Sequence, residues 1–227
     1  VFQQILSAGF FSNQEIGRSF SKNLPKFESP YLEAAILTAS NMHYDEIIKT
    51  IPTERKIFEQ LIQVGIKEHR SALNKRINDI YRNSNTLKKL QFSRLWMKAM
   101  RKAGIDLDKM EKNGFFGQEM KLKKVLRNAE NLALNSKANI QLRLEAIETI
   151  SLGSLLHSNS ISVLKELIKP NNQSILRYKA IDSVANMSKN EPAKMLLAAW
   201  PSLIREGRKK TLDVLLSRPS WQEELLQ

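Results

Sequence analysis

Residues 170–184 read PNNQSILRYKAIDSV, and residues 201–215 read PSLIREGRKKTLDVL. In both stretches a proline is followed seven residues later by an arginine, and aliphatic residues then follow at helical spacing. The second stretch begins about 31 residues after the first, and a repeat of this length in a helical pattern is typical of an α-solenoid, in which each unit is a pair of helices. The shared positions are Pro170, Arg177, Ala180 and Val184 in the first stretch, and Pro201, Arg208, Thr211 and Leu215 in the second.

A third, partial copy has Arg143, Ala146 and Ile150 at the corresponding positions and no leading proline. It lies about 34 residues upstream of the first stretch, which is again a typical length for a two-helix repeat. Pro25 precedes Leu32 by the same seven residues, so a degenerate copy with leucine in place of arginine lies near the start. The sequence therefore predicts one HEAT-like solenoid domain over residues 1–227. Its sections are degenerate repeats (1–69), a basic irregular section (70–123) and regular repeats (124–227).

The composition also favours an all-α protein. Apolar residues make up 42 % of the chain, but it has only 8 glycines and 7 prolines, too few for the frequent turns of a β-sandwich or barrel. No segment shows convincing strand alternation. Beyond two short helices in residues 1–24, we predict helices at 30–39, 43–51, 53–69, 71–82, 86–103, 120–134, 140–152, 161–168, 174–187, 192–200 and 205–216, with a last helix from 221 and a loop at 105–117.

The repeat residues have a structural interpretation. A small residue beside a large aliphatic one, as in Ala146-Ile147, lets two helices cross closely. Proline ends the shorter helix, because its ring cannot continue the hydrogen-bond ladder. The arginine early in the next helix can cover apolar surface with its stem and reach a carboxylate or a helix end with its head. The alternative is that Arg143, Arg177 and Arg208 contact a ligand.

The ordered run of these motifs from about residue 124 resembles HEAT repeats. The motifs are Ala129-x2-Leu132-Ala133, Arg143-x2-Ala146-Ile147, Ala198-Ala199-Trp200-Pro201 and Leu215-x-Ser217-Arg218-Pro219. The run is similar to the HEAT region of large bacterial multidomain proteins described as membrane-bound dehydrogenases. That resemblance implies a sugar-dehydrogenase-like β-propeller before the region, a c-type cytochrome after it, and an exported protein. This chain contains neither flanking domain and no cysteine. We therefore expect it to be a segment of a longer chain.

No catalytic, cofactor or metal site is expected. Without cysteine there are no disulfides, thiolate ligands or cysteine nucleophiles. His43, His69 and His157 stand far apart, and the carboxylates between Asp106 and Glu111 lack the glycine and oxygen ligands of a calcium loop. No phosphate-binding loop or hydrolase motif is present. No apolar run approaches the length of a transmembrane helix, which needs roughly 18 residues or more.

The net charge of +13 is concentrated in the middle of the chain. Residues 67–128 hold 17 Lys and Arg against 6 Asp and Glu, a net of +11. Two clusters and three nearby aromatic residues form the candidate site for an anionic partner. They are Arg94, Lys98, Arg101 and Lys102; Lys121, Lys123, Lys124 and Arg127; and Trp96, Phe115 and Phe116.

Two interpretations of the basic residues stay open. They can simply solvate outer helix faces with the aromatic residues in the core, or they can bind an acidic protein, a nucleic acid or an anionic lipid surface. We expect a non-catalytic scaffold that binds other proteins and links the domains of a larger redox protein. The alternative is a nucleic-acid-binding solenoid, similar to the HEAT-type DNA glycosylases, that uses the basic stretch.

Overall fold

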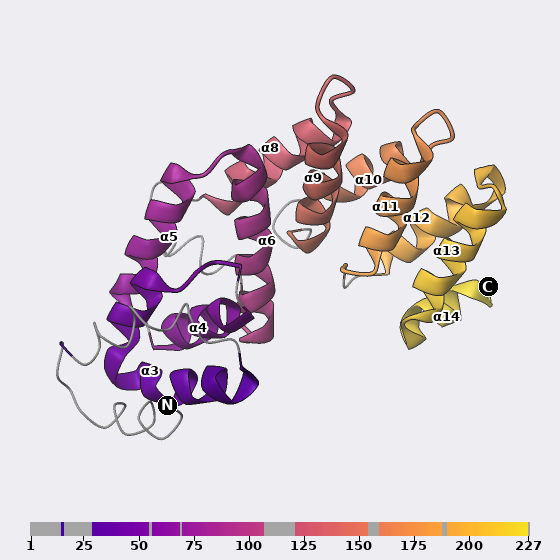
Figure 1. Cartoon of the computed structure of the whole chain (residues 1–227). Coiled ribbons are helices and arrows are strands. Elements are labelled where there is room, and N and C mark those ends of the chain that lie inside the picture. The colour runs from indigo at the N-terminus through magenta and orange to yellow at the C-terminus, as the bar shows by residue number, and fades with distance from the viewer. Residues whose placement is uncertain are drawn as a thin grey trace. The chain divides into compact units, whose positions relative to one another are not determined.

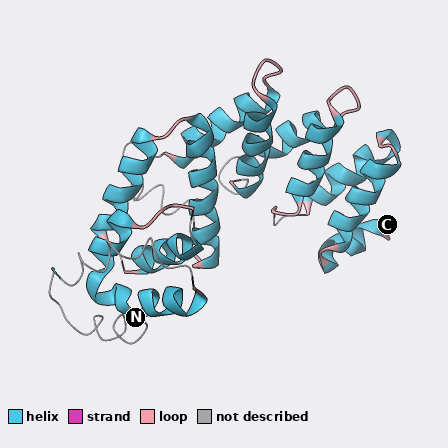
Figure 2. Cartoon of the chain, in the orientation of Figure 1, coloured by secondary structure: helices cyan, strands magenta, loops and turns pink. Residues whose placement is uncertain are grey.

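The computed structural model describes residues 15, 29–54, 56–68, 70–106, 121–153, 159–187 and 190–226. The described residues form helices joined by short loops and contain no strand, so the prediction of an all-helical chain is confirmed for them (Figure 2). Almost all of the predicted short helices in residues 1–24 and most of the predicted loop at 105–117 lie outside the described residues. His69, His157, Phe115 and Phe116 also lie outside them.

The chain forms two compact units. Unit 1 comprises residues 1–84 and 95–119, and unit 2 comprises residues 85–94 and 120–227. The division falls inside helix α6 (Thr86–Lys102), so the predicted basic section at 70–123 contributes to both units. That the two units fold together as one domain stays a prediction.

Unit 1 is built on helices α3 (Pro30–Thr50), α4 (Lys56–Lys67) and α5 (Ser71–Asn83), with α3 packed against both of the others (Figure 1). The sequence predicted two helices where α3 lies. In the structure α3 consists of two helical segments joined at a kink at His43, whose φ of −120° and ψ of 20° leave the helical region, and the second predicted helix begins at this residue. No proline or glycine lies between Ala39 and His43, so neither residue type accounts for the kink.

Tyr44 fixes the crossing of α3 and α4. Its side chain is fully buried, and its hydroxyl donates a hydrogen bond of 2.8 Å to the Leu61 carbonyl oxygen. Gly65 leaves the space for this ring, because a Cβ at that position would overlap the tyrosine hydroxyl. Burial raises the pKa of the Tyr44 hydroxyl above its ordinary value.

Unit 2 contains seven helices in its described part, besides the first half of α6 and a short 3-10 helix. Their bounds agree with the predicted ranges to within three residues, and those of α9 and α13 are identical. The helices are α8 (Leu122–Leu134), α9 (Ile140–Leu152), α10 (Ser160–Ile168), α11 (Ser174–Val184), α12 (Glu191–Ala199), α13 (Arg205–Leu216) and α14 (Pro219–Leu225), with η2 at Trp200–Ser202.

These helices pack in two rows. In the first row α9 contacts α11 and α11 contacts α13; in the second, α8 contacts α10, α10 contacts α12 and α12 contacts α14 (Figure 1). Pairs such as α8 with α9 and α10 with α11 join the rows. The core of the unit draws residues from both rows, and the repeat positions Ala146, Ala180 and Thr211 are fully buried in it.

Two of the repeat arginines bond the ends of earlier helices. Arg143 Nε donates to the Ala133 carbonyl oxygen at the end of α8 (3.0 Å), and Arg208 donates to the carbonyl oxygens of Trp200 and Pro201 after α12 (3.3 Å each). Helix-end carbonyls lack intrahelical partners, so a guanidinium satisfies them and favours the negative end of the helix dipole. The corresponding Nε of Arg177 is buried and has no hydrogen-bond partner among the described residues. Pro170 lies exposed in the turn after α10, and Pro201 lies exposed in the 3-10 helix η2.

Candidate functional site

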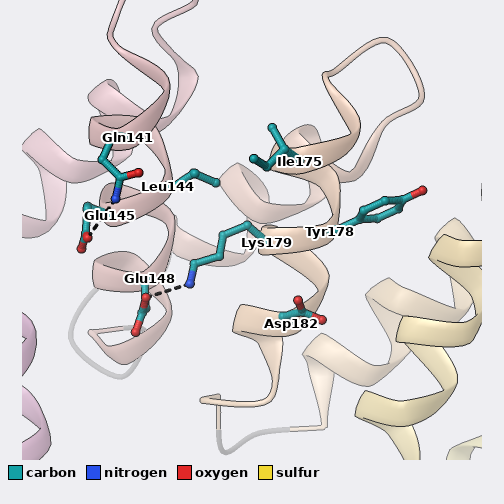
Figure 3. A pocket seen from close by; sticks show the side chains of 8 residues that line it. All are labelled: Gln141, Leu144, Glu145, Glu148, Ile175, Tyr178, Lys179 and Asp182. Atoms are coloured by element: carbon teal, nitrogen blue, oxygen red, sulfur yellow. Dashed lines mark hydrogen bonds and ion pairs between the residues drawn. The ribbon is translucent and has the colours of Figure 1, made fainter.

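A series of ion pairs runs across the first row of unit 2. Arg94 on α6 bonds both Glu145 (2.6 Å) and Glu148 on α9. Lys179 on α11 bonds Glu148 from the other side at 2.8 Å (Figure 3). Lys210 on α13 then bonds Asp182 on α11 at 3.2 Å. We call these six residues the ion-pair ladder.

The ladder follows the sequence repeat. Lys179 and Lys210 are one repeat apart and occupy the same position of successive repeats, as do Glu148 and Asp182. At each junction, a carboxylate on one helix of the first row forms an ion pair with the lysine on the next helix of that row. The contacts at the α9–α11 and α11–α13 junctions are therefore two copies of one arrangement.

An open groove lies between α9 and α11, beside the ladder, with a cavity volume of about 320 Å³. Both helices contribute equally to its walls, and all the lining side chains are drawn in Figure 3. The lining residues are Gln141, Leu144, Glu145 and Glu148 from α9, and Ile175, Tyr178, Lys179 and Asp182 from α11.

The groove combines apolar contact surface with carboxylates. Leu144 and Ile175 lie at the end where the two helices begin, and Ile175 is 52 % exposed although it is a large aliphatic residue. The Tyr178 ring lies on the side toward α13, with the Lys210 ammonium 6.0 Å from its centre. Three carboxylates and one ammonium line the groove, and two further cations, Arg94 and Lys210, pair with these carboxylates from outside its lining.

Local contacts position the groove side chains firmly. The Asn139 side chain caps α9 by accepting a hydrogen bond from the Gln141 backbone at 2.8 Å, which sets where the helix begins. Glu145 is only 8 % exposed and accepts hydrogen bonds from Gln91 (3.3 Å) and Gln141 (3.4 Å) besides its ion pair. Such a surface can recognise a side chain in a fixed place without rearranging.

The charged side chains of the groove are already engaged with cations and anions of the chain itself. All three of its carboxylates are held in ion pairs with Arg94, Lys179 or Lys210. Among the residues that the structure describes, no three His, Cys, Asp or Glu side chains gather where they could hold a metal ion. The remaining lining side chains are the aliphatic Leu144 and Ile175, the aromatic Tyr178 and the amide Gln141.

The first predicted basic cluster contributes to the molecule's own contacts. Arg94 belongs to the ion-pair ladder, with a side chain only 16 % exposed, and Lys102 bonds Glu59 on α4 at 2.7 Å. Lys98 is exposed on α6 and Arg101 is half-buried. Trp96 is fully buried in unit 1, so its ring is not a surface on which a base could stack.

The second cluster lies at the start of α8. Lys121 directly precedes the helix, and Lys121, Lys124 and Arg127 are exposed, while Lys123 is half-buried. These residues belong to unit 2, whereas Lys98, Arg101 and Lys102 belong to unit 1.

Sequence reasoning missed the groove and the acids that line it. The available signal was the shared spacing in Lys179-x-x-Asp182 and Lys210-x-x-Asp213, which places a cation and an acid one turn apart in each repeat. Solvated helix faces show the same spacing, so it does not by itself reveal a junction between helices.

Comparisons with known proteins found no match for this chain. No family model matches it, and neither a curated protein nor a solved structure does so. Among the described helices, none is long and apolar enough to cross a lipid bilayer.

Proposed function

We propose that the chain is a non-catalytic protein-interaction module, an α-solenoid of HEAT-like helix pairs, that binds a segment of a partner protein in the groove between α9 and α11. The observation that carries the proposal is the groove itself, where an exposed isoleucine, Ile175, lies beside carboxylates held in place by the ion-pair ladder. The two-row packing and its repeated ion pairs support the solenoid assignment.

The groove defines the chemistry of its partner. An aliphatic side chain can enter between Leu144 and Ile175, where burying it contributes about 1.5–3 kcal/mol. A lysine or arginine of the partner can share the Asp182 carboxylate, which is 49 % exposed in its pair with Lys210, and such complementarity contributes mainly to specificity. The partner segment therefore carries a cation beside an aliphatic residue, rather than the acidic partner that the basic stretch suggested.

A peptide-display selection on the immobilised full chain tests this function. We expect enriched peptides to carry Lys or Arg next to Leu, Ile or Val, and to be retained by the wild type but not by the variant Ile175→Asp. Aspartate in the first turn of α11 is compatible with the helix dipole, so this variant keeps its fold. Recovery of acidic peptides, or equal retention by Ile175→Asp, would contradict the proposal.

The proposal includes a role as scaffold in an exported redox protein. That part rests on the resemblance of residues 124–227 to the HEAT region of multidomain dehydrogenases. The full sequence of the parent gene tests it: a β-propeller upstream and a Cys-x-x-Cys-His motif downstream are expected, and a gene without the downstream motif contradicts it.

Nucleic-acid binding is the second candidate, and the exposure of Lys121, Lys124 and Arg127 at the start of α8 favours it. Positive charges near the N-terminus of a helix are repelled by the positive end of the helix dipole. An anionic partner bound there would offset this repulsion. Phosphate contacts would make DNA binding fall steeply with salt. Absence of binding to duplex and single-stranded DNA at about 50 mM salt excludes this candidate.

A further inference from the structure

The last row helix, α13, carries an acid at the ladder position that has no cation opposite it. Asp213 follows Asp182 by one repeat and Glu148 by two, so all three occupy the same position in the repeat. Glu148 and Asp182 each bond the lysine of the next row helix. Asp213 is exposed, and no ion pair joins it to another residue in the described part of the chain.

The apolar residues beside Asp213 are also more exposed than their counterparts on α9 and α11. At the preceding repeat position, Ile147 on α9 and Ile181 on α11 are fully buried, whereas Leu212 on α13 is 39 % exposed. Leu216, one turn further along α13, is 50 % exposed. Leu212, Asp213 and Leu216 thus form one exposed face, which we call the α13 face. It presents large aliphatic groups around a carboxylate.

We propose that the α13 face docks a cationic amphipathic helix of a partner, in the arrangement by which α11 receives α13. The occupant carries a lysine opposite Asp213. The lysine is followed by a small residue, such as alanine or threonine, and then by a large aliphatic residue. That order occurs at Lys179-Ala180-Ile181 and Lys210-Thr211-Leu212, which hold corresponding places at the α9–α11 and α11–α13 junctions of unit 2. Charge complementarity and repetition of an existing interface both point to this occupant.

This inference is independent of the groove. It concerns a different helix and a helical occupant, and it requires neither Ile175 nor the cavity between α9 and α11. Either proposal can fail while the other stands.

The test uses the chain's own sequence as the probe. Residues 200–217 are copied after Gln227, so that a second α13 follows α14 through the connection that joins α12 to α13. Docking should slow amide hydrogen exchange at residues 212–216 about tenfold or more, and should raise the thermal midpoint. Exchange in α9 serves as the internal control, because docking leaves that helix unchanged.

Charge variants separate a specific junction from simple crowding by the added segment. Asp213→Lys in the parent α13 should abolish the added protection, as should Lys210→Asp in the copy. Combining the two substitutions should restore the protection, because the ion pair is re-formed with its charges exchanged. Unchanged exchange in the extended chain, or protection that survives Asp213→Lys alone, would overturn the inference.

Discussion

At the scale of single residues, the repeat arginines show how one sequence position ties helices together. Arg143 is 6 % exposed, and burial lowers the pKa of its guanidinium. Its Nε donates a hydrogen bond to the Ala133 carbonyl oxygen at the end of α8. Arg208 makes the corresponding bonds at an exposed site. Arg218 extends the pattern, with its guanidinium 2.7 Å from the Ala185 carbonyl oxygen after α11.

Arg143→Ala should therefore destabilise the protein more than Arg208→Ala. The first variant leaves the end of α8 without its charged donor and removes a buried side chain, so we expect a loss of about 1.5–3 kcal/mol. The second loses only solvent-exposed bonds, and we expect a loss of about 1 kcal/mol or less. Urea denaturation measures both values, and equal losses would contradict a structural role for Arg143.

Alanine substitutions at two helical glycines, Gly65 and Gly207, are expected to change stability in opposite directions. A Cβ on Gly65 would overlap the Tyr44 hydroxyl and lie 2.8 Å from Leu73, whereas one on Gly207 would meet Leu203 at 3.4 Å and Tyr178 at 3.7 Å. Gly65→Ala should cost about 1–3 kcal/mol through overpacking. Gly207→Ala should be neutral or stabilise by up to about 1 kcal/mol through helix propensity. A stabilising Gly65→Ala in thermal denaturation would show that the α3–α4 crossing is looser than described.

Tyr44 makes the stability of unit 1 depend on pH in the alkaline range. Its folded pKa is raised by burial, so its contribution to stability is fully present below the ordinary value of about 10 and is lost as pH rises beyond it, when the unfolded chain ionises. Burial also raises the pKa of Tyr81, with the same sign.

Tyr44→Phe should lose about 1 kcal/mol near neutral pH, because the bond to Leu61 is absent. Its free energy of unfolding should then fall less steeply than that of the wild type between pH 10 and 11, by at most about 1.4 kcal/mol per pH unit. Tyr81 is present in both proteins and cancels in the comparison. Parallel stability curves in urea at the two pH values would contradict the buried, neutral hydroxyl.

At the scale of helices, Glu148 connects three of them, because it bonds Arg94 on α6 and Lys179 on α11 from its place on α9. Glu148→Gln should cost about 1.5–3 kcal/mol, since two partly buried cations lose their shared carboxylate. Asp182→Asn is the control. Its pair with Lys210 joins side chains that are 49 % and 29 % exposed, so its loss should be below about 1 kcal/mol.

Salt distinguishes the two variants further. Screening in about 1 M NaCl should remove most of the effect of Asp182→Asn and leave most of the effect of Glu148→Gln, because partly buried pairs are screened less. Equal losses of stability for Glu148→Gln and Asp182→Asn in urea denaturation would mean that Glu148 stabilises the ion-pair ladder no more than Asp182 does.

The helices could be predicted from the sequence because their signals are local. The aliphatic period and the small-large steps predicted α9 and α13 with identical bounds. The ladder could not be predicted, because it depends on which helix faces meet. Arg94 belongs by sequence to a basic cluster, but packing places it against Glu145 and Glu148. Likewise the exposure of Ile175 follows from the space beside α9, and not from its helical position.

At the scale of the whole molecule, the net charge of the chain does not describe the local charges of the groove between α9 and α11. The chain is strongly basic, yet two residues of its first basic cluster form ion pairs with carboxylates of the chain itself, and the groove between α9 and α11 is lined by three carboxylates that are paired with the chain's own cations. Net charge thus predicts solubility and non-specific attraction to anions rather than the chemistry of this groove. Within unit 2, both proposed binding surfaces lie on the first row of helices, which the repeat arranges.

The most direct test is a fluorescence-anisotropy titration of a labelled peptide from the display selection against the wild type, Ile175→Asp and Ile140→Asp. Ile140 is the matched control, an isoleucine 37 % exposed in the first turn of α9 that does not line the groove. Loss of one buried isoleucine contact should weaken binding by Ile175→Asp about tenfold or more and leave Ile140→Asp within about twofold of the wild type. Equal affinities in all three proteins, or a larger loss from Ile140→Asp, would contradict the groove as the binding site.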